Sequence, residues 1–404
     1  MRPVAWRPLL SLAALALSAV AGCTTGKASP KPSAKVDTLP SGTVRVSSAE
    51  PTGWSDTSRA WHFREVARYG GADGAAGELV QPGSIGVDAF GRVYIADRKP
   101  PTVKVFDSTG ALIRVIGREG SGPGEFRVAF IAVRNDLLVV HDPQQSRTSV
   151  FDTAGTYLRS WKSSCCYWDE IYIDQEKRIY IPTATTFDRN AQPRGTAFSR
   201  YQVDGTLIDT LWVPIRDEGK EWRVSSKDGK MQMSTSVPFT PQIRRAYHPA
   251  GGFVYGWNGS YALARSTTGA DTTRLLQRTW TADPIPDSLR QARTNETLKW
   301  VSEQYGEATA KAAIRMSDVP TTAPAFLDLR IDEGETLWAR RLIGTDSTKT
   351  AYDVFGPDGS WLGSVSVPTG TPEWGGMYID RSSIYAATED ADGRPVVVRL
   401  RVVR

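Results

Sequence analysis

The sequence predicts an all-β fold, a six-bladed β-propeller of four-stranded antiparallel blades, with a short helical insertion between blades four and five. Short apolar runs alternate with turn signals from Trp61 to the C-terminus. A glycine-containing turn recurs between the third and fourth strands, and six matching second strands can be found along the chain. Repeats of four short strands are typical of propeller blades.

Blade one carries the complete pattern. Residues 86–97 contain a strand, a turn at Ala89–Gly91 and a second strand. Residues 102–107 form the third strand, and residues 111–117 form the fourth after a turn at 108–110. Each run is short, and each gap has the length of a hairpin loop. These residues therefore predict one antiparallel sheet.

The pattern recurs along the rest of the chain. The turn between third and fourth strands returns at residues 151–155, 201–205, 267–269 and 354–359. The second strands of blades two to six are predicted at residues 137–140, 178–181, 252–255, 336–338 and 383–385. Blade six, which begins at Gly376, supplies only three strands. We predict that His62–Tyr69 adds the fourth strand, because closing the ring removes open sheet edges.

Residues 284–318 break the β pattern. Apolar residues between Leu289 and Ile314 recur at helix spacing, and Asp287 or Ser288 can cap the first turn. We expect one or two helices that pack on the face or side of the propeller. The alternative is a helix that presents a surface to a partner.

The N-terminus has the features of an export signal. Arg2 and Arg7 are followed by an apolar stretch, Leu9–Val20, which is too short to span a bilayer. The sequence Val20-Ala21-Gly22-Cys23 resembles the lipobox of bacterial lipoproteins, which implies cleavage after residue 22 and diacylation of Cys23. Residues 1–22 are therefore predicted to be a signal peptide. The alternative is an ordinary secreted protein in which Cys23 is incidental.

Residues 23–58 are rich in Ser, Thr, Pro, Lys and Gly, a composition that predicts a flexible linker between the lipid and a propeller over residues 59–404. Several acyl chains give a durable membrane anchor. Lipoproteins with Asp after the cysteine tend to stay at the inner membrane. Thr24 at that position favours the outer membrane.

Four segments resemble NHL-type propeller repeats, as found in six-bladed propeller lipoproteins of bacteria. They are Gly77–Pro82, Gly86–Asp88, Val93–Asp97 and Gly120–Phe126. The resemblance is close over residues 64–160, loosens in blades three and four, and returns in blade five. It implies a cell-envelope propeller. A different blade number, a β-helix and a sandwich are the alternatives.

Propellers bind ligands at one mouth of the central channel, where the loops after the second strands converge. Aligning the blades places these residues there: Asp97, Arg98, His141, Asp142, Thr183, Trp257, Asn258, Arg340, Arg341, Thr388 and Glu389. Their chemistry suits an anionic or sugar-like ligand. The alternative is that they cap loops or link adjacent blades by hydrogen bonds.

Cys165 and Cys166 lie next to each other in the connection from blade two to blade three, close to Trp168. Adjacent Cα atoms lie about 3.8 Å apart, below the usual disulfide range of about 4.4–6.8 Å, so a bond between these cysteines would be strained. Such a ring beside Trp168 is a candidate apolar platform for a ligand. Two buried thiols that fill space between blades are the alternative.

No catalytic residue and no metal ligand is assigned from the sequence. The chain has three scattered histidines, His62, His141 and His248, and no Gly-x-Ser-x-Gly motif. Propellers of the gluconolactonase type bind a divalent metal through acidic and amide side chains. Asp97, Asp142 and Asn258 are the candidates for such a site, and only under this alternative is a cofactor expected.

The formal charge of +5 is spread along the chain without a basic run, which argues against a nucleic-acid partner. We expect a lipid-anchored propeller in the bacterial cell envelope, at the outer rather than the inner membrane. Its expected role is a binding or scaffolding module for a protein, peptide or glycan. The alternatives are a metal-dependent hydrolase or lyase of gluconolactonase type and a purely structural envelope protein.

Overall fold

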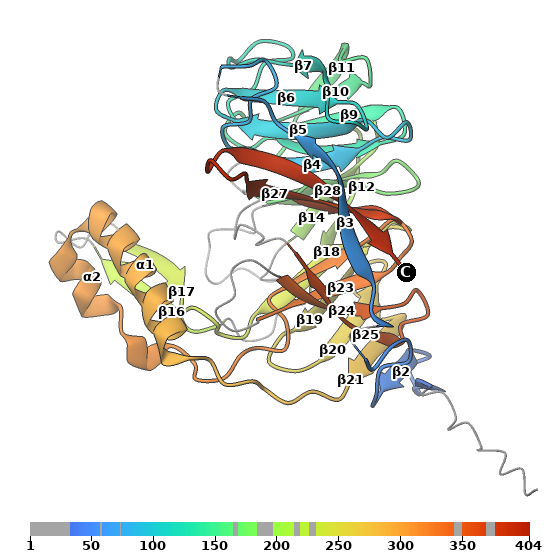
Figure 1. The fold of residues 1–404 in the computed structure, drawn as a ribbon, viewed down its shortest axis with the longest axis vertical. Coiled ribbons are helices and arrows are strands. Elements are labelled where there is room, and N and C mark those ends of the chain that lie inside the picture. Colours follow the sequence, from blue (N-terminus) through green and yellow to red (C-terminus); the bar gives the residue numbers. More distant parts are fainter. Residues whose placement is uncertain are drawn as a thin grey trace, which may run out of the picture. The chain divides into compact units, whose positions relative to one another are not determined.

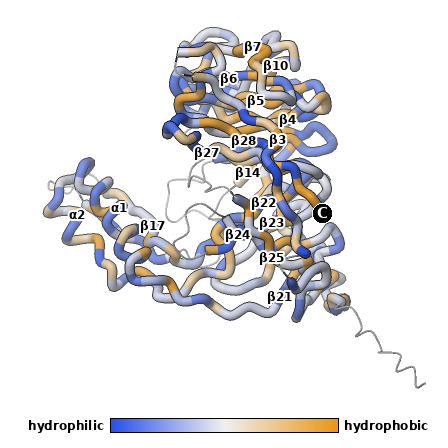
Figure 2. Tube along the Cα trace, viewed as in Figure 1, coloured by the Kyte–Doolittle hydropathy of each residue, from blue (hydrophilic) through white to orange (hydrophobic). Residues whose placement is uncertain are grey.

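The structure is a computed structural model. It describes residues 33–56, 59–72, 74–164, 169–183, 197–213, 219–225, 232–342, 350–368 and 376–404. Six blades, each with four antiparallel strands, follow one another along the chain and form a six-bladed β-propeller, as predicted (Figure 1). Hydrophobic residues concentrate in the blade strands, and hydrophilic residues gather at the turns (Figure 2).

Blades one to three are consecutive in the chain. Blade one consists of β4 (Pro82–Val87), β5 (Val93–Arg98), β6 (Pro101–Phe106) and β7 (Leu112–Ile116). Blade two consists of β8 (Phe130–Arg134), β9 (Leu137–Asp142), β10 (Arg147–Asp152) and β11 (Tyr157–Lys162). Blade three consists of β12 (Tyr172–Ile173), β13 (Ile179–Thr183), β14 (Ala197–Tyr201) and β15 (Leu207–Trp212).

Blades four to six complete the ring. Blade four consists of β18 (Ile243–Tyr247), β19 (Phe253–Trp257), β20 (Ala262–Ser266) and β21 (Arg274–Arg278). Blade five consists of β22 (Asp328–Ile331), β23 (Leu337–Arg341), β24 (Thr350–Phe355) and β25 (Trp361–Val367). Blade six consists of β26 (Met377–Ile379), β27 (Ser383–Glu389), β28 (Pro395–Val403) and β3 (His62–Tyr69).

The ring closes through β3, and this prediction is confirmed. β3 pairs antiparallel with β28, from Val397 opposite Tyr69 to Val403 opposite His62. The Tyr69 side chain is fully buried, and its ring centroid lies 5.8 Å from that of Phe106 in blade one. The N-terminal strand therefore completes blade six and also packs against blade one.

The hydrophobic core is divided among the gaps between blades. Each pair of neighbouring blades shares one cluster of buried apolar side chains, including the pair formed by blades six and one. Aromatic side chains of the second strands fill several of these gaps, and Tyr94, Tyr180, Trp338 and Tyr385 are almost completely buried. Each blade thus depends on both of its neighbours for burial of its two faces.

An aspartate holds the turn between the first and second strands in several blades. In blade one, Asp88 accepts hydrogen bonds from the backbone N–H of Phe90 and Arg92, both at 2.9 Å, and from the Tyr94 hydroxyl at 3.1 Å. The same pairing of a turn aspartate with a second-strand aromatic recurs as Asp174–Tyr180, Asp332–Trp338 and Asp380–Tyr385. The carboxylate holds the turn and satisfies a polar atom of the core aromatic.

The structure corrects the linker prediction for part of its length. Residues 23–58 were expected to form a flexible tether, but β1 (Lys35–Thr38) and β2 (Val44–Ser48) extend the sheet of blade four, where β2 runs parallel to β21. The Val46 side chain is buried, as is Trp54 against blade five. The outer edge of β21 offers unpaired backbone groups, which pairing with β2 satisfies.

The helical insertion lies between β21 and β22, as predicted. It contains α1 (Asp287–Tyr305), α2 (Glu307–Ala313) and the short 3-10 helix η2 (Met316–Asp318). The expected cap is wrong: Pro286 precedes the helix without a side-chain cap, and Asp287 pairs with Arg290 at 2.6 Å instead. None of the helices in the described residues is long and apolar enough to cross a membrane.

The helices pack on a hairpin rather than on a blade. β16 (Glu221–Ser225) and β17 (Gln232–Ser236) pair between blades three and four, and the sequence patterns did not predict them. Trp222 of the hairpin, Val301 of α1 and Ala310 of α2 are buried in one cluster, which includes no blade residue among those described. Two insertions, far apart in the chain, therefore form one small module with its own core.

We predict that Gly110→Ala destabilises the protein more than Gly91→Ala. Both glycines have positive φ, but a Cβ at Gly110 would collide with the carbonyl oxygen of Arg68 in β3, whereas a Cβ at Gly91 would meet nothing within 4 Å. Gly91→Ala measures the left-handed strain alone, about 1–2 kcal/mol. Gly110→Ala should add about 1–3 kcal/mol of overpacking.

Urea denaturation of the two variants measures this difference. Equal losses of stability would contradict the placement of β3 against the Gly110 turn.

Candidate functional site

Several of the predicted residues lie at equivalent positions of their blades, at the ends of the second strands. Asp97, Asp142 and Arg340 lie at the ends of β5, β9 and β23, and Asn258 directly follows β19. This is the end from which the chain continues to the third strand. The alignment of the blades made from the sequence is therefore reproduced in the secondary structure.

Asp97 is fully buried and holds the connection that leads into blade one. Its carboxylate accepts the backbone N–H of Val80 at 3.0 Å and of Gln81 at 2.8 Å. Lys104 of β6 forms an ion pair with it at 2.7 Å and also donates to the carbonyl of Glu78. Both carboxylate oxygens are thus engaged inside the protein, and the buried charge is paired.

Asp142 has the same role in blade two. It accepts the backbone N–H of Arg127 at 2.7 Å, from the connection before β8, and the backbone N–H of Gln144 at 3.0 Å. The amide of Gln145 also donates to it at 2.7 Å. A buried carboxylate that accepts several N–H groups holds the connection before β8 and the turn after β9 together.

Asn258 takes the place of the aspartate in blade four, and its side-chain amide forms hydrogen bonds with two segments of the chain. Its Oδ1 accepts the backbone N–H of Gln242 at 2.6 Å, and its Nδ2 donates to the carbonyl of Phe326 at 2.7 Å. The three candidate metal ligands lie in three separate blades, and the described residues contain no cluster of three His, Cys, Asp or Glu side chains suited to a metal. Their polar atoms hold the propeller together.

His141 also points into the fold. Its Nδ1 lies 3.1 Å from the hydroxyl oxygen of Thr148 and 3.3 Å from that of Ser163, and its Nε2 is buried without a described partner. Burial lowers the pKa of His141 to about 4, against a weaker opposing effect of Asp142. The ring is therefore neutral near pH 7 and is a packed core group in this structure.

The remaining predicted residues are partly accessible or outside the described chain. Arg98 lies over the ring of Phe130, 5.8 Å from its centroid, and Trp257 is half-buried. Arg341 pairs with Asp283 at 2.9 Å. Cys23, Cys165, Cys166 and Trp168 lie outside the described residues, so their predicted roles stay predictions.

Two ion pairs cross the central channel, and the sequence patterns did not reveal them. Arg134 of blade two pairs with Glu333 of blade five at 2.6 Å, although these blades lie opposite each other in the ring. Arg330 of blade five pairs with Glu170, which precedes blade three, also at 2.6 Å. Arg134 donates further to the Tyr172 hydroxyl at 3.1 Å. The channel is therefore bridged by side chains.

A second pair of arginines has no such partner. Arg244 of β18 and Arg340 of β23 are half-buried at the gap between blades four and five, and the Nε of each is buried without a hydrogen bond. Neither guanidinium forms a hydrogen bond or ion pair with any described residue. Asp328 attracts Arg244 electrostatically but is itself paired with Arg330 at 3.3 Å.

Burial of Arg244 has an electrostatic consequence. Desolvation lowers the pKa of Arg244, and the neighbouring positive charges of Arg340 and Arg245 lower it further against the opposing effect of Asp328. Two partly dehydrated cations close to each other favour an anion between them. Guanidinium groups match carboxylate and phosphate geometry well, because they donate two parallel hydrogen bonds. This gap is the candidate anion site that the described residues support best.

Of the residues predicted from the sequence, only Arg340 belongs to this gap. Arg244 was missed because it lies on a first strand, whereas the alignment considered the ends of second strands. A signal was present: Arg244 and Arg245 interrupt an otherwise apolar strand between Ile243 and Ala246. Adjacent charges on an inner strand are unusual unless they are paired or bind a ligand.

Comparisons with known proteins support the fold. A family model described as a "6-bladed beta-propeller" matches residues 78–209. Among curated proteins, no sequence matches this chain.

Several solved structures resemble the chain at low identity. One, named as an exported protein of Bacteroides fragilis, is 14% identical and covers 89% of this chain and 100% of its own, with a TM-score of 0.51. A member of the DUF4221 family from Bacteroides vulgatus is 9% identical over 85% of this chain and 98% of its own, with a TM-score of 0.49. A streptogramin B lyase is 10% identical over 86% of this chain and 100% of its own, with a TM-score of 0.42. At such identities only the propeller fold is supported.

We predict that Asp142→Ala destabilises the protein by about 3 kcal/mol or more, because it leaves several buried N–H donors without an acceptor. Asp136→Ala is the matched control, since Asp136 is exposed and forms only a surface ion pair with Lys177. That variant should lose less than about 1 kcal/mol. Guanidinium denaturation followed by tryptophan fluorescence measures both. A loss for Asp142→Ala as small as that of the control would contradict its role in holding the loops.

Proposed function

We propose that this protein is a lipid-anchored, extracytoplasmic β-propeller that binds an anionic group of a protein, peptide or glycan at the mouth of its channel. The observation that carries this proposal is the pair Arg244 and Arg340, which are half-buried close to each other and form no hydrogen bond or ion pair through their guanidinium groups with the described residues. A partly dehydrated guanidinium pair is stabilised when a carboxylate, sulfate or phosphate group binds between its members.

The binding role is favoured over the gluconolactonase-type alternative because the candidate metal ligands already form hydrogen bonds within the protein. Asp97, Asp142 and Asn258 already use their side-chain oxygens on backbone N–H groups in separate blades. Recruiting them to a metal would release buried N–H donors, each at a cost of about 1–3 kcal/mol. A stoichiometric divalent metal in the purified protein, lost in Asp97→Ala, would nevertheless favour the enzyme.

The proposed location rests on the N-terminal sequence. The lipobox-like Val20–Cys23 and the resemblance to NHL-type propeller lipoproteins both support a lipid on Cys23. The similarity to a structure named as an exported protein agrees with export. Thr24 after the cysteine favours the outer membrane over the inner one. The ligand would then lie in the cell envelope, and the channel mouth would be the surface that meets it.

We predict that replacement of both arginines, in Arg244→Gln/Arg340→Gln, abolishes anion binding. Isothermal titration of the full-length protein in detergent would use three probes: inorganic phosphate, an oligogalacturonate and a glutamate-rich peptide. At least one should bind, and the double variant should bind it at least tenfold more weakly. Arg64→Gln is the control, because Arg64 is exposed on β3. Absence of binding by every probe, or equal binding by the double variant, would contradict the anion site.

We predict that Cys23→Ser releases the protein from the membrane fraction. The serine cannot form the thioether that holds the lipid, so a radiolabelled fatty acid should enter the natural protein and not the variant. Fractionation of cells expressing each form measures the distribution. Persistence of Cys23→Ser in the membrane, with unchanged labelling, would show that anchoring depends on another group.

A further inference from the structure

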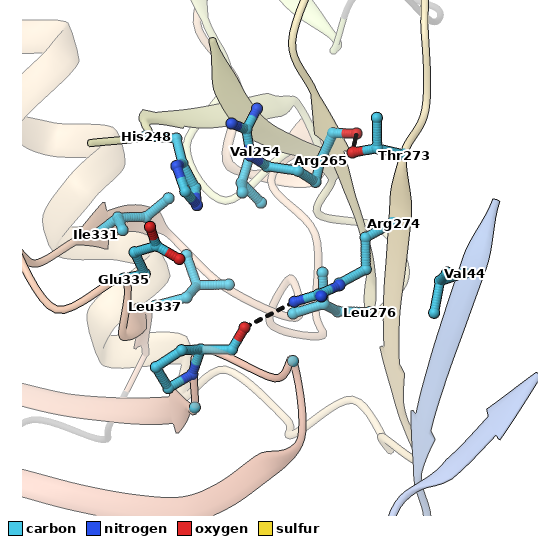
Figure 3. A pocket seen from close by; sticks show the side chains of 13 residues that line it. Val44, His248, Val254, Arg265, Thr273, Arg274, Leu276, Ile331, Glu335 and Leu337 are labelled. Atoms are coloured by element: carbon cyan, nitrogen blue, oxygen red, sulfur yellow. Dashed lines mark hydrogen bonds between the residues drawn. The ribbon is translucent and has the colours of Figure 1, made fainter. Parts of the chain in front are cut away.

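A cavity lies at the opposite end of the strands from the channel mouth. It has a volume of about 270 Å³ and is formed by blades four and five, with Val44 of β2 at one side (Figure 3). Its rim comes from the turns between first and second strands, which contain His248 and Glu335, and from the turn around Pro357. This cavity is separate from the gap that holds Arg244 and Arg340, so its ligand is independent of the proposed function.

The lining of the cavity is part polar and part apolar. Its apolar lining comes from four strands of the two blades, and the residues are Val254, Leu276, Ile331 and Leu337. The volume lies just below the usual range for small-molecule sites, about 300–1,000 Å³. The ligand is therefore small, with an apolar body of the size of one or two amino-acid side chains.

Two opposite charges face each other across this cavity. Figure 3 shows the guanidinium of Arg274 and the carboxylate of Glu335 pointing into the cavity from opposite walls. Arg274 donates to the carbonyl of Pro357 at 2.7 Å and pairs with no described carboxylate. The carboxylate of Glu335 forms no hydrogen bond or ion pair with the described part of the chain, and Arg265 attracts it electrostatically. Both charges are available to a ligand.

The position of Glu335 is conformationally unusual. Its φ is 63°, in the left-handed region, where a non-glycine residue is disfavoured by about 1–2 kcal/mol. The corresponding turn position in blade one is Gly91, which adopts a similar φ of 76° without this penalty. The equivalent position of blade three is Lys177, with a φ of 61°, so the same turn conformation recurs with another side chain.

His248 adds a neutral donor. Its Nδ1 accepts the backbone N–H of Ala250 at 3.2 Å, which leaves the proton of the neutral ring on Nε2. Burial, together with the positive charges of Arg265 and Arg274, lowers the pKa of His248 to about 3. Arg265 also lines the cavity, and its guanidinium donates to the carbonyl of Gly251 at 2.5 Å. Arg274 is the second cation of the lining, and its guanidinium points into the cavity (Figure 3).

We propose that this cavity binds a small zwitterion with an apolar side chain, in particular a free hydrophobic amino acid. Arg274 binds its carboxylate, Glu335 binds its ammonium group, and the apolar lining surrounds its side chain. A ligand with one charge would leave the opposite charge of the cavity without a partner. The cavity is therefore selective for molecules that carry both charges at the two ends of a short backbone.

The test compares leucine with its two singly charged analogues. Isothermal titration of the full-length protein should show binding of L-leucine or L-phenylalanine, and binding at least tenfold weaker of N-acetyl-leucine and of leucinamide. Glu335→Gln should remove the discrimination against N-acetyl-leucine, and Arg274→Gln the discrimination against leucinamide. Glu221→Gln and Arg64→Gln, at exposed positions, should change neither. Thermal unfolding confirms that each variant is folded.

Three results would overturn the proposal: no binding of either amino acid, equal binding of the acetylated and free forms, or binding that neither Glu335→Gln nor Arg274→Gln alters. The double variant Arg244→Gln/Arg340→Gln should bind leucine normally. Its behaviour separates this site from the anion site at the channel mouth, because failure of one leaves the other intact.

Discussion

The pairing of β3 with β28 is the contact on which the propeller depends. Every other strand of a blade pairs with a neighbour close in sequence, whereas this pairing joins the two ends of the ring. Without β3, β28 would expose an unpaired edge, and the cluster between blades six and one would lose Ala67 and Tyr69. Since each blade buries both of its faces against neighbours, an open ring would also expose apolar surface on two blades.

In the closed ring, polar residues at the two ends of the strands have different roles. At the channel mouth, Asp97, Asp142 and Asn258 hold the connections between blades, and at the other end aspartates such as Asp88 hold the turns and their core aromatics. Positions that depart from this repeat are the ones to which we assign binding. His248 occupies the position of the turn aspartate in blade four, because its N–H donates to Gly252 as that of Asp88 donates to Arg92. Departures from an otherwise consistent repeat are expected at functional sites.

The blades could be predicted from the sequence because hairpins are local: turn residues such as Gly110 and short apolar runs lie within one stretch of chain. The ring closure followed from counting strands. β1 and β2 could not be predicted, because their few apolar residues lie in a segment of linker-like composition, and they form strands only where β21 offers an edge. The partners of polar residues were also hidden. Arg134 and Glu333 are far apart in the sequence, and only the order of blades around the ring brings them together.

Side chains bridge the central channel. The pairs Arg134–Glu333 and Arg330–Glu170 bridge it, and Arg134 and Glu333 lie beside turns between first and second strands, at the end opposite the channel mouth. These pairs balance their own charges, whereas Arg244 is desolvated and lies close to the like charge of Arg340. An anion that binds between them removes part of that penalty, and by linkage it stabilises the folded state. The same argument applies to Arg274 and Glu335, which point into one cavity (Figure 3) and to which we assign a ligand that carries both charges. In both places the fold retains charge that a smaller, neutral side chain would avoid, and this cost is the physical reason to assign binding to them.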